Sequence, residues 1–98
     1  MGSIVALSQN QVISQVEGNI VSDMDGEKVM FSITNGKYYN LGEIGGVIWD
    51  LIENQSTPES IVQELMKQYD VDRELCEDQV MSFMDMLYGE GLISVVSK

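Results

Sequence analysis

The clearest alternation of apolar and polar residues covers residues 28–34 (KVMFSIT), and it predicts a half-buried antiparallel strand. Successive side chains of a strand point to opposite faces, so this segment presents two different surfaces. One surface carries Val29, Phe31 and Ile33, and the other carries Met30, Ser32 and Thr34. We expect this strand to be the middle one of a small sheet.

Turn-forming pairs flank this strand on both sides. Asp25-Gly26 comes before it and Asn35-Gly36 comes after it, and such pairs favour the backbone angles of tight hairpin turns. The sequence therefore predicts a three-stranded meander whose outer strands are residues 19–23 and 37–41. Because residues 37–41 form the last strand, we expect one of its edges to carry unpaired backbone N–H and C=O groups.

Beyond the last strand, the apolar residues recur at spacings of three and four, which is typical of helices. The first predicted helix follows the strand directly through a turn at Gly42. It contains Gly45 and Gly46, each of which lowers helix propensity by roughly 1 kcal/mol relative to alanine. We expect the close approach of another backbone to account for this pair.

Two further helices have recognisable ends. The second is predicted for residues 58–69, because Thr57 is a good N-cap and a proline follows it at the first helical position. The third begins near Asp72 or Arg73, where acidic side chains suit the helix dipole. Glycines within residues 89–91 end this third helix.

The third predicted helix carries more apolar surface than one small core needs. A stripe of residues at helical spacing is expected to be buried, and it consists of Cys76, Val80, Phe83 and Leu87. Other apolar residues flank this stripe: Met81, Met84 and Tyr88 on one side, Leu75 and Met86 on the other. We expect one flank to face a bound partner, and periodicity does not determine which flank that is.

Weaker patterns occupy the two ends of the chain. Residues 1–18 are predicted to form an N-terminal arm or an extra strand, and residues 92–96 an apolar tail or a short strand. A length of 98 residues suits one domain, which we assign to residues 19–96. The order of elements predicts an α+β fold that is winged-helix-like, with a three-stranded antiparallel sheet followed by three helices.

Charge narrows the set of partners. Five Lys and Arg against sixteen Asp and Glu give a net charge of −11, so nucleic acid and anionic membrane surfaces would be repelled. The third predicted helix carries only Arg73 as a basic residue, which is the wrong sign for a helix that reads DNA. No apolar run approaches the roughly 18 residues that span a bilayer. These features predict a cytoplasmic protein with no nucleic acid and no membrane partner.

The chain offers little material for catalysis. It has no histidine and one cysteine, and it lacks phosphate-binding glycine loops and Cys-x-x-Cys pairs. Cys76 lies on the predicted buried stripe without a histidine to activate it, so we expect a structural thiol. Adjacent carboxylates such as Glu77 and Asp78 are typical of solvated helix starts. The sequence therefore predicts a protein that is not an enzyme and has no cofactor or metal.

Three segments in order resemble a known family. They are YYNLGEIGGVIWDLI at residues 38–52, STPESIVQEL at residues 56–65 and VMSFMDMLYGEGLI at residues 80–93. Together they resemble the PqqD-like family, the recognition elements of ribosomally made, post-translationally modified peptides (RiPPs). The resemblance implies a three-stranded sheet followed by three helices. It also implies that the protein binds the leader segment of a precursor peptide for tailoring enzymes.

Within that family, a free-standing acidic chain of this length looks most like the leader-binding protein of lasso-peptide biosynthesis. The resemblance then implies a separate leader peptidase and a macrolactam-forming cyclase as partners. Binding is expected by β-strand addition, in a groove between the last strand and the third helix. The expected leader-binding residues are Lys37, Tyr38, Tyr39, Asn40 and Leu41 of the strand, with Cys76, Val80, Phe83, Met84 and Leu87 of the helix. The alternative hypothesis is a winged-helix module for protein interaction or regulation that has no role in peptide processing.

Overall fold

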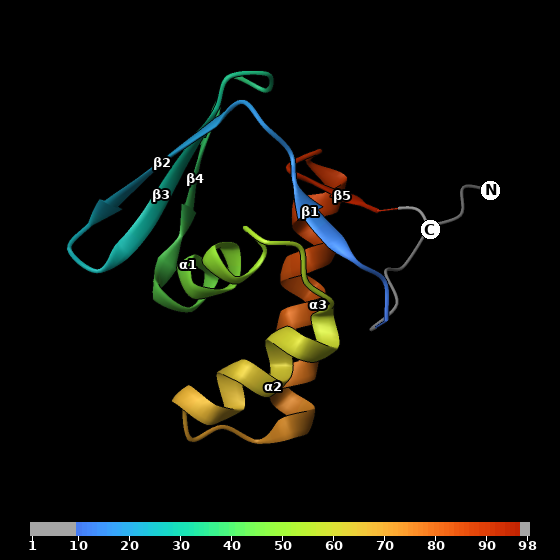
Figure 1. The fold of residues 1–98 in the computed structure, drawn as a ribbon. Helices are drawn as coiled ribbons and strands as arrows, with labels where there is room; N and C mark the ends of the chain where they lie inside the picture. The colour runs from blue at the N-terminus through green and yellow to red at the C-terminus, as the bar shows by residue number, and fades with distance from the viewer. Residues whose placement is uncertain (1–9, 97–98) are drawn as a thin grey trace.

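The computed structural model describes residues 10–96, which form five strands and three helices (Figure 1). In chain order these are β1 (Ile13–Gln15), β2 (Asn19–Met24), β3 (Glu27–Ser32), β4 (Lys37–Leu41), α1 (Gly42–Leu51), α2 (Pro58–Gln68), α3 (Arg73–Gly89) and β5 (Ile93–Val95). Strands β2, β3 and β4 form an antiparallel sheet in that order, and β1 pairs with β5. The predicted α+β architecture, a three-stranded antiparallel sheet followed by three helices, is confirmed.

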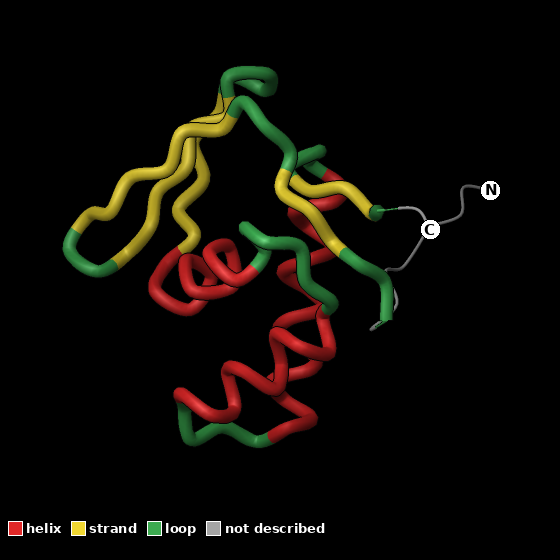
Figure 2. The backbone as a smooth tube through the Cα atoms, viewed as in Figure 1, coloured by secondary structure: helices red, strands yellow, loops and turns green. Residues whose placement is uncertain are grey.

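The elements lie in three groups, namely the three-stranded sheet with α1, the pair of α2 and α3, and the short pair of β1 and β5 (Figure 2). The three-stranded sheet projects to one side and packs against α1, chiefly through β3. Helices α2 and α3 pack on each other, and β5 follows α3 and lies against it. Among the helices, α1 is therefore the one that packs most closely on the sheet.

Both predicted hairpins are present, but their turns differ. In the first, Asp25 and Gly26 have φ angles of 58° and 86°, as the predicted type I′ turn requires. In the second, Ser32 pairs with Lys37, so the loop has four residues, and Gly36 alone of the Asn-Gly pair has a positive φ. Asn35 instead donates its backbone N–H to Ser32 Oγ at 3.1 Å, which leaves its side chain free to reach elsewhere.

The structure decides which face of the sheet is buried. Met30 and Ser32 of β3 are buried, whereas Phe31 is half-buried on the opposite face. Phe31 aligns there with exposed Ile20 of β2 and exposed Tyr38 of β4, and its ring centroid lies 4.7 Å from that of Tyr38. Helix α1 packs against β3, so the Met30 face joins the core and the Phe31 face is left outside.

The junction between β4 and α1 forms as predicted at Gly42, whose φ is 74°. Asn40 Oδ1 accepts a hydrogen bond from the Gly42 N–H at 2.9 Å, which stabilises the turn. The expected reason for the glycine pair that follows is wrong, because side chains and not another backbone approach it. A Cβ on Gly45 would lie 3.0 Å from Phe83 Cζ, and one on Gly46 would lie 2.8 Å from Lys28 Cγ.

Helices α2 and α3 begin at the predicted residues. Thr57 Oγ1 accepts from the Ser60 N–H at 3.1 Å, and Pro58 occupies the first helical position. Asp72 caps α3 by accepting from the Leu75 N–H at 3.2 Å. Such local caps depend on residues three apart, which explains why the sequence alone located them.

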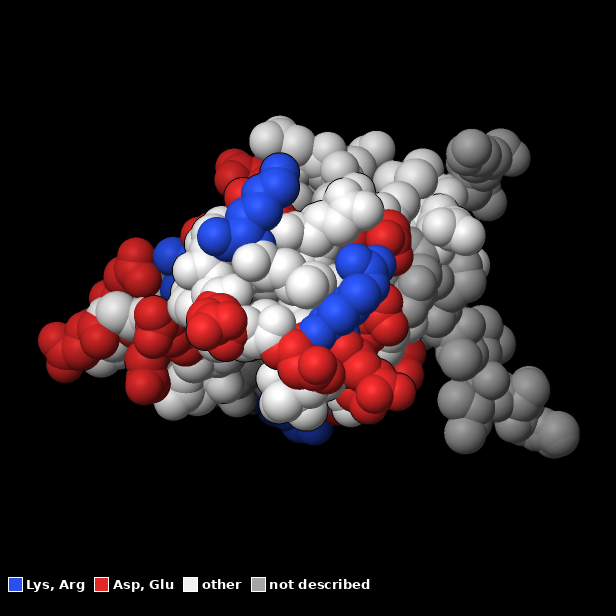
Figure 3. All heavy atoms as spheres, turned by 90° about the horizontal axis from the view of Figure 1, so that it is seen from below, with Lys and Arg blue, Asp and Glu red and all other residues white. Residues whose placement is uncertain are grey.

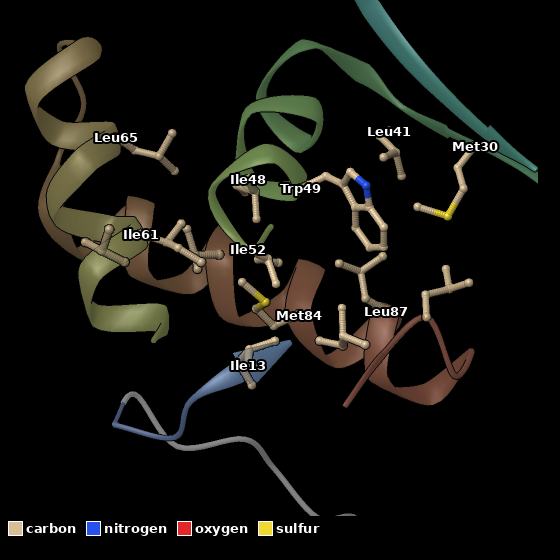
Figure 4. Close-up of a cluster of buried hydrophobic side chains, with 14 of the residues drawn as sticks. Ile13, Met30, Leu41, Ile48, Trp49, Ile52, Ile61, Leu65, Met84 and Leu87 are labelled. Atoms are coloured by element: carbon tan, nitrogen blue, oxygen red, sulfur yellow. The ribbon is translucent and has the colours of Figure 1, made fainter. Parts of the chain in front are cut away.

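The core lies between α1, α2 and α3 and is closed by side chains of β1, β3 and β5 (Figure 4). Of the stripe predicted for α3, Cys76, Val80 and Leu87 are buried. Phe83 is only half-buried, and Met84, with 0% of its surface exposed, occupies the core in its place. Consecutive helical residues point about 100° apart, so a small rotation of α3 exchanges the roles of these two side chains.

The ends of the described chain pair with each other. Strand β1 lies within the segment for which an arm or an extra strand was predicted, and β5 within the predicted tail or strand, so both contain strands. Ile13 of β1 is 0% exposed, pairs with Val95, and exchanges backbone hydrogen bonds with Ser56. Residues 1–9 of the predicted arm lie outside the described residues. From β1 onward the segment contributes to the core.

Candidate functional site

Strand β4 offers an open edge. It pairs with β3 on one side, and within residues 10–96 no strand pairs with its other side. Such an edge presents backbone N–H and C=O groups that can accept a further strand. The expectation that the last strand of the meander is an edge strand is therefore confirmed for the described chain.

An apolar pocket of about 260 Å³ lies next to the end of β4, between the three helices. Leu41 is the last residue of β4 and the strand's only member of the pocket lining. The other lining residues come from the helices and the loop after α2: Ile44, Gly45, Ile48, Leu65, Tyr69, Val71, Leu75, Cys76, Gln79, Val80 and Phe83. Leu75 is 53% exposed, and Ile44 and Val71 are exposed as well, so the pocket opens to solvent through an apolar rim.

The residues expected to bind a peptide fall into three groups. Lys37, Tyr38 and Asn40 are exposed on β4, Tyr39 is half-buried, and Leu41 is buried in the pocket wall. On α3, three of the five expected residues line the pocket: Cys76, Val80 and Phe83. Met84 and Leu87 are each 0% exposed and lie in the core (Figure 4), so their side chains do not reach the pocket.

The structure also selects the flank of α3 that faces outward at this site. Leu75, Gln79 and Phe83 all line the pocket, and their spacing of four residues places them on one face of the helix. The flank that carries Leu75 is therefore the one beside the pocket. The sequence signal for this flank was Leu75, a leucine placed among the acidic residues at the start of α3. The contributions of α1 and α2 to the pocket carried no comparable signal, because they depend on how the helices pack.

A polar cluster connects β4 to the end of α3. Tyr39 Oη donates to Glu90 Oε1 at 2.7 Å, and Asn35 Nδ2 donates both to Tyr39 Oη at 3.0 Å and to the Glu90 carbonyl oxygen at 2.8 Å. Lys37 Nζ lies 3.7 Å from the same Glu90 Oε1. The hydrogen bond from Tyr39, and after it the charge of Lys37, lower the pKa of Glu90 below its ordinary value.

Over residues 27–93 the sequence matches the family described as Coenzyme PQQ synthesis protein D (PqqD). This match covers more than half of the chain. The chain belongs to the PqqD family. The recognition made from the three sequence segments is thereby confirmed.

Solved structures show the same PqqD-family fold. TbiB1 in complex with the TbiA(beta) leader peptide is 27% identical, with a TM-score of 0.76, over 87% of this chain and 99% of that chain. Lasso peptide synthetase B1 complexed with the leader peptide is 20% identical, with a TM-score of 0.73, over 84% and 96%. The solution structure of the PqqD part of PqqCD from Methylobacterium extorquens, a stand-alone RiPP recognition element, is 17% identical, with a TM-score of 0.77, over 93% and 97%. The last two likenesses concern the fold alone. No curated protein matches the chain.

The pocket wall contains one thiol, that of Cys76. Burial raises the pKa of the Cys76 thiol in the pocket wall, and the nearby Glu77 carboxylate acts in the same direction, which disfavours the nucleophilic thiolate. Across residues 10–96, no three potential metal ligands come together. In the same range, no helix has the length and apolar character needed to cross a bilayer.

Acidic and basic side chains are distributed unevenly over the molecule. In the view from below (Figure 3), acidic side chains cover the left tip and continue across the middle and lower part of the face, with basic side chains and uncharged atoms among them. Two basic side chains are already paired: Arg73 with Glu59 and Glu77, and Lys28 with Asp23 and Asp50. With a net charge of −11, the molecule presents an acidic field to a ligand.

Proposed function

We propose that this PqqD-family protein binds the leader segment of a ribosomally made precursor peptide as a strand added antiparallel to β4. The observation that carries the proposal is the open edge of β4 directly beside an apolar pocket. Strand addition supplies backbone hydrogen bonds, and a pocket for alternate side chains supplies selectivity. The TbiB1 structure, 27% identical to this chain, contains a leader peptide, which supports the same class of ligand here.

The two parts of the site contribute differently to affinity. Each backbone hydrogen bond replaces one made to water, so its net contribution is only about 0.5–1.5 kcal/mol. Burial of one leucine- or phenylalanine-sized side chain contributes about 1.5–3 kcal/mol. A pocket of about 260 Å³ has room for such a side chain. The leader therefore needs an apolar residue placed to enter the pocket while its backbone pairs with β4.

The wider role follows from the same proposal. The protein delivers the leader to a leader peptidase and a macrolactam cyclase of lasso-peptide biosynthesis, and it acts by binding without catalysing a step. It works in the cytoplasm, where ribosomes make the precursor. The net charge of −11 favours a leader that contains Lys or Arg, because opposite charge speeds encounter and lowers competition from acidic peptides.

A titration of the isotopically labelled protein tests the binding site. The ligand is the synthetic TbiA(beta) leader, and the leader of a precursor peptide encoded near the gene of this protein, once one is identified, is the second probe. We expect the amide signals of β4 and of Leu75, Gln79 and Phe83 to shift with micromolar or tighter affinity, while those of β2 stay in place. Shifts confined to β2 or α2 would show that the site is elsewhere. If neither leader binds, the interaction or regulatory module becomes the better hypothesis.

A further inference from the structure

The hairpin between β3 and β4 is connected to the end of α3 by side chains more than 50 residues apart in sequence. Three hairpin residues converge on Glu90, the first residue after the helix. Tyr39 donates to its carboxylate at 2.7 Å, Lys37 lies 3.7 Å from the same oxygen, and Asn35 donates to its carbonyl at 2.8 Å. Asn35 also donates to the Tyr39 hydroxyl at 3.0 Å, so the contacts form one network.

The position of Glu90 is unfavourable for the helix itself. The last carbonyl groups of a helix give its C-terminal end a partial negative charge, which repels a carboxylate. The last turn of α3 contains no basic residue that would offset this repulsion. Groups from the hairpin provide the compensation, namely a hydroxyl donor from Tyr39 and an ammonium group from Lys37. The helix end and the hairpin therefore depend on each other electrostatically.

This network lies at one end of the space between β4 and α3. Strand β4 has its main contacts with β3 and α1, so it is not anchored to α3 along its length. At the other end, Leu41 of β4 and Phe83 of α3 both lie beside Gly45 of α1, so α1 bridges the two elements there. Phe83 and Glu90 are about 10 Å apart along the helix axis, at 1.5 Å per residue. The two connections thus bracket the stretch beside which an added strand would lie.

We infer that Asn35, Tyr39 and Glu90 are positioning residues that set the distance between β4 and α3, and thereby the width of the leader groove. The inference rests on the proposed function. A groove held at its bound width costs less ordering when the leader arrives, so the side chains of the network raise affinity by fixing that width and not by binding the leader themselves. The hydroxyl of Tyr39 and the carboxylate of Glu90 act as a unit, and Asn35 donates to that hydroxyl and to the backbone carbonyl of Glu90.

Two conservative substitutions weaken the contact between Tyr39 and Glu90 with little change in shape. Tyr39→Phe removes the donor, and Glu90→Gln removes the charge. Matched controls on α3 are Tyr88→Phe and Asp85→Asn, which remove a hydroxyl and a charge from exposed positions outside the network. The first measurement needs no ligand. Amide hydrogen exchange of β4 in the free protein is expected to become about tenfold faster in both network variants, since opening of the hairpin becomes easier.

The second measurement is affinity for the synthetic TbiA(beta) leader, taken well below the melting temperature of every variant. Each network variant is expected to bind the leader about 5- to 10-fold more weakly than the parent. The double variant should bind no more weakly than the single variant with the lower affinity, because the two groups form one contact. Both control variants should bind as the parent does.

The outcomes separate this inference from the proposed function. If the parent binds the leader at β4 and Tyr39→Phe binds equally well, the positioning role is overturned and the binding site stands. If affinity falls only in proportion to melting temperature, the network is merely structural and the inference fails. If the parent does not bind but exchange of β4 still accelerates in the variants, the connection is real and its purpose is not leader binding.

Discussion

The three-stranded sheet has two open edges within residues 10–96, and they differ in what lies beside them. The edge of β4 stands next to the apolar pocket rimmed by Leu75 and Val71. Beside β2 lies a larger, polar hollow of about 690 Å³, whose lining includes Gln15, Lys28, Asp50 and Glu53. Lys28 is engaged there by Asp23 and Asp50, and Gln15 donates to the Trp49 carbonyl at 2.7 Å.

This difference shows why an open edge alone is a poor predictor of a binding site. Both edges offer backbone N–H and C=O groups. When such a group exchanges its hydrogen bond to water for one to a peptide, the net gain is only about 1 kcal/mol. An apolar wall adds burial of side chains at about 25 cal/mol per Å². Within the described residues 10–96, β4 alone has such a wall, so β4 is the edge expected to hold a peptide.

The largest expected effect separates the core side of α3 from its pocket side. Met84→Ala removes a side chain that is 0% exposed and should destabilise the protein by about 2–5 kcal/mol, because a cavity remains in the core. Leader affinity in the folded variant should stay within about twofold of the parent, since Met84 does not reach the pocket. Urea unfolding and a binding titration measure the two quantities. Weaker binding at unchanged stability would return Met84 to the leader-binding set expected from the sequence.

The pocket side is tested by Leu75→Asp. A carboxylate at the rim makes the wall beside β4 as polar as the one beside β2, and leader affinity should fall about 30-fold, which is about 2 kcal/mol. Leu75 is 53% exposed, and an acidic residue suits the first turn of α3, so melting temperature should change little. Leu75→Met is the conservative control. Tyr88→Asn, about 140° away around the helix, controls for loss of an exposed apolar residue.

Acid should loosen β4 and leave β2 as it is. The pKa of Glu90 is lower in the folded protein than its ordinary value of about 4.3, so its contribution to stability is complete above that pH. The contribution is lost as pH falls through the lowered pKa of the folded state. The difference in melting temperature between the parent and Glu90→Gln should therefore shrink below about pH 4. Tyr39→Phe removes the main cause of the lowered pKa. If the difference in melting temperature between the parent and Glu90→Gln stays constant down to pH 3, this account is wrong.

The smallest effect is expected at the other edge. Ile20→Asp places a charge on exposed β2, and leader affinity should change by less than about twofold, because β2 has no apolar pocket beside it. Calorimetric titration with the same leader provides the measurement. A loss as large as that of Leu75→Asp would mean that the outer face of the sheet takes part in binding, and the contrast between the two edges would be lost.

Recognition of the family from three sequence segments succeeded because each segment combines several local signals in order. The residues of the candidate site were only partly predictable. Cys76, Val80 and Phe83 lie in the pocket wall, on the helix where the resemblance implied a groove, but Met84 took the core position that periodicity had predicted for Phe83. The roles of Asn35 and Glu90 were not predicted, because their contact joins a turn to a helix end 55 positions away.

The sequence by itself determined where strands, turns and helices begin and end: the Asp25-Gly26 turn, the Gly42 junction, and the caps at Thr57 and Asp72. These features depend on interactions among residues within about four positions of one another. Only the tertiary structure decided that β3 buries Met30 and not Phe31, that α3 turns Leu75 toward the pocket, and that β1 pairs with β5. Periodicity defines the faces of an element but not its rotation against its neighbours, which is settled when side chains from distant segments pack into one core.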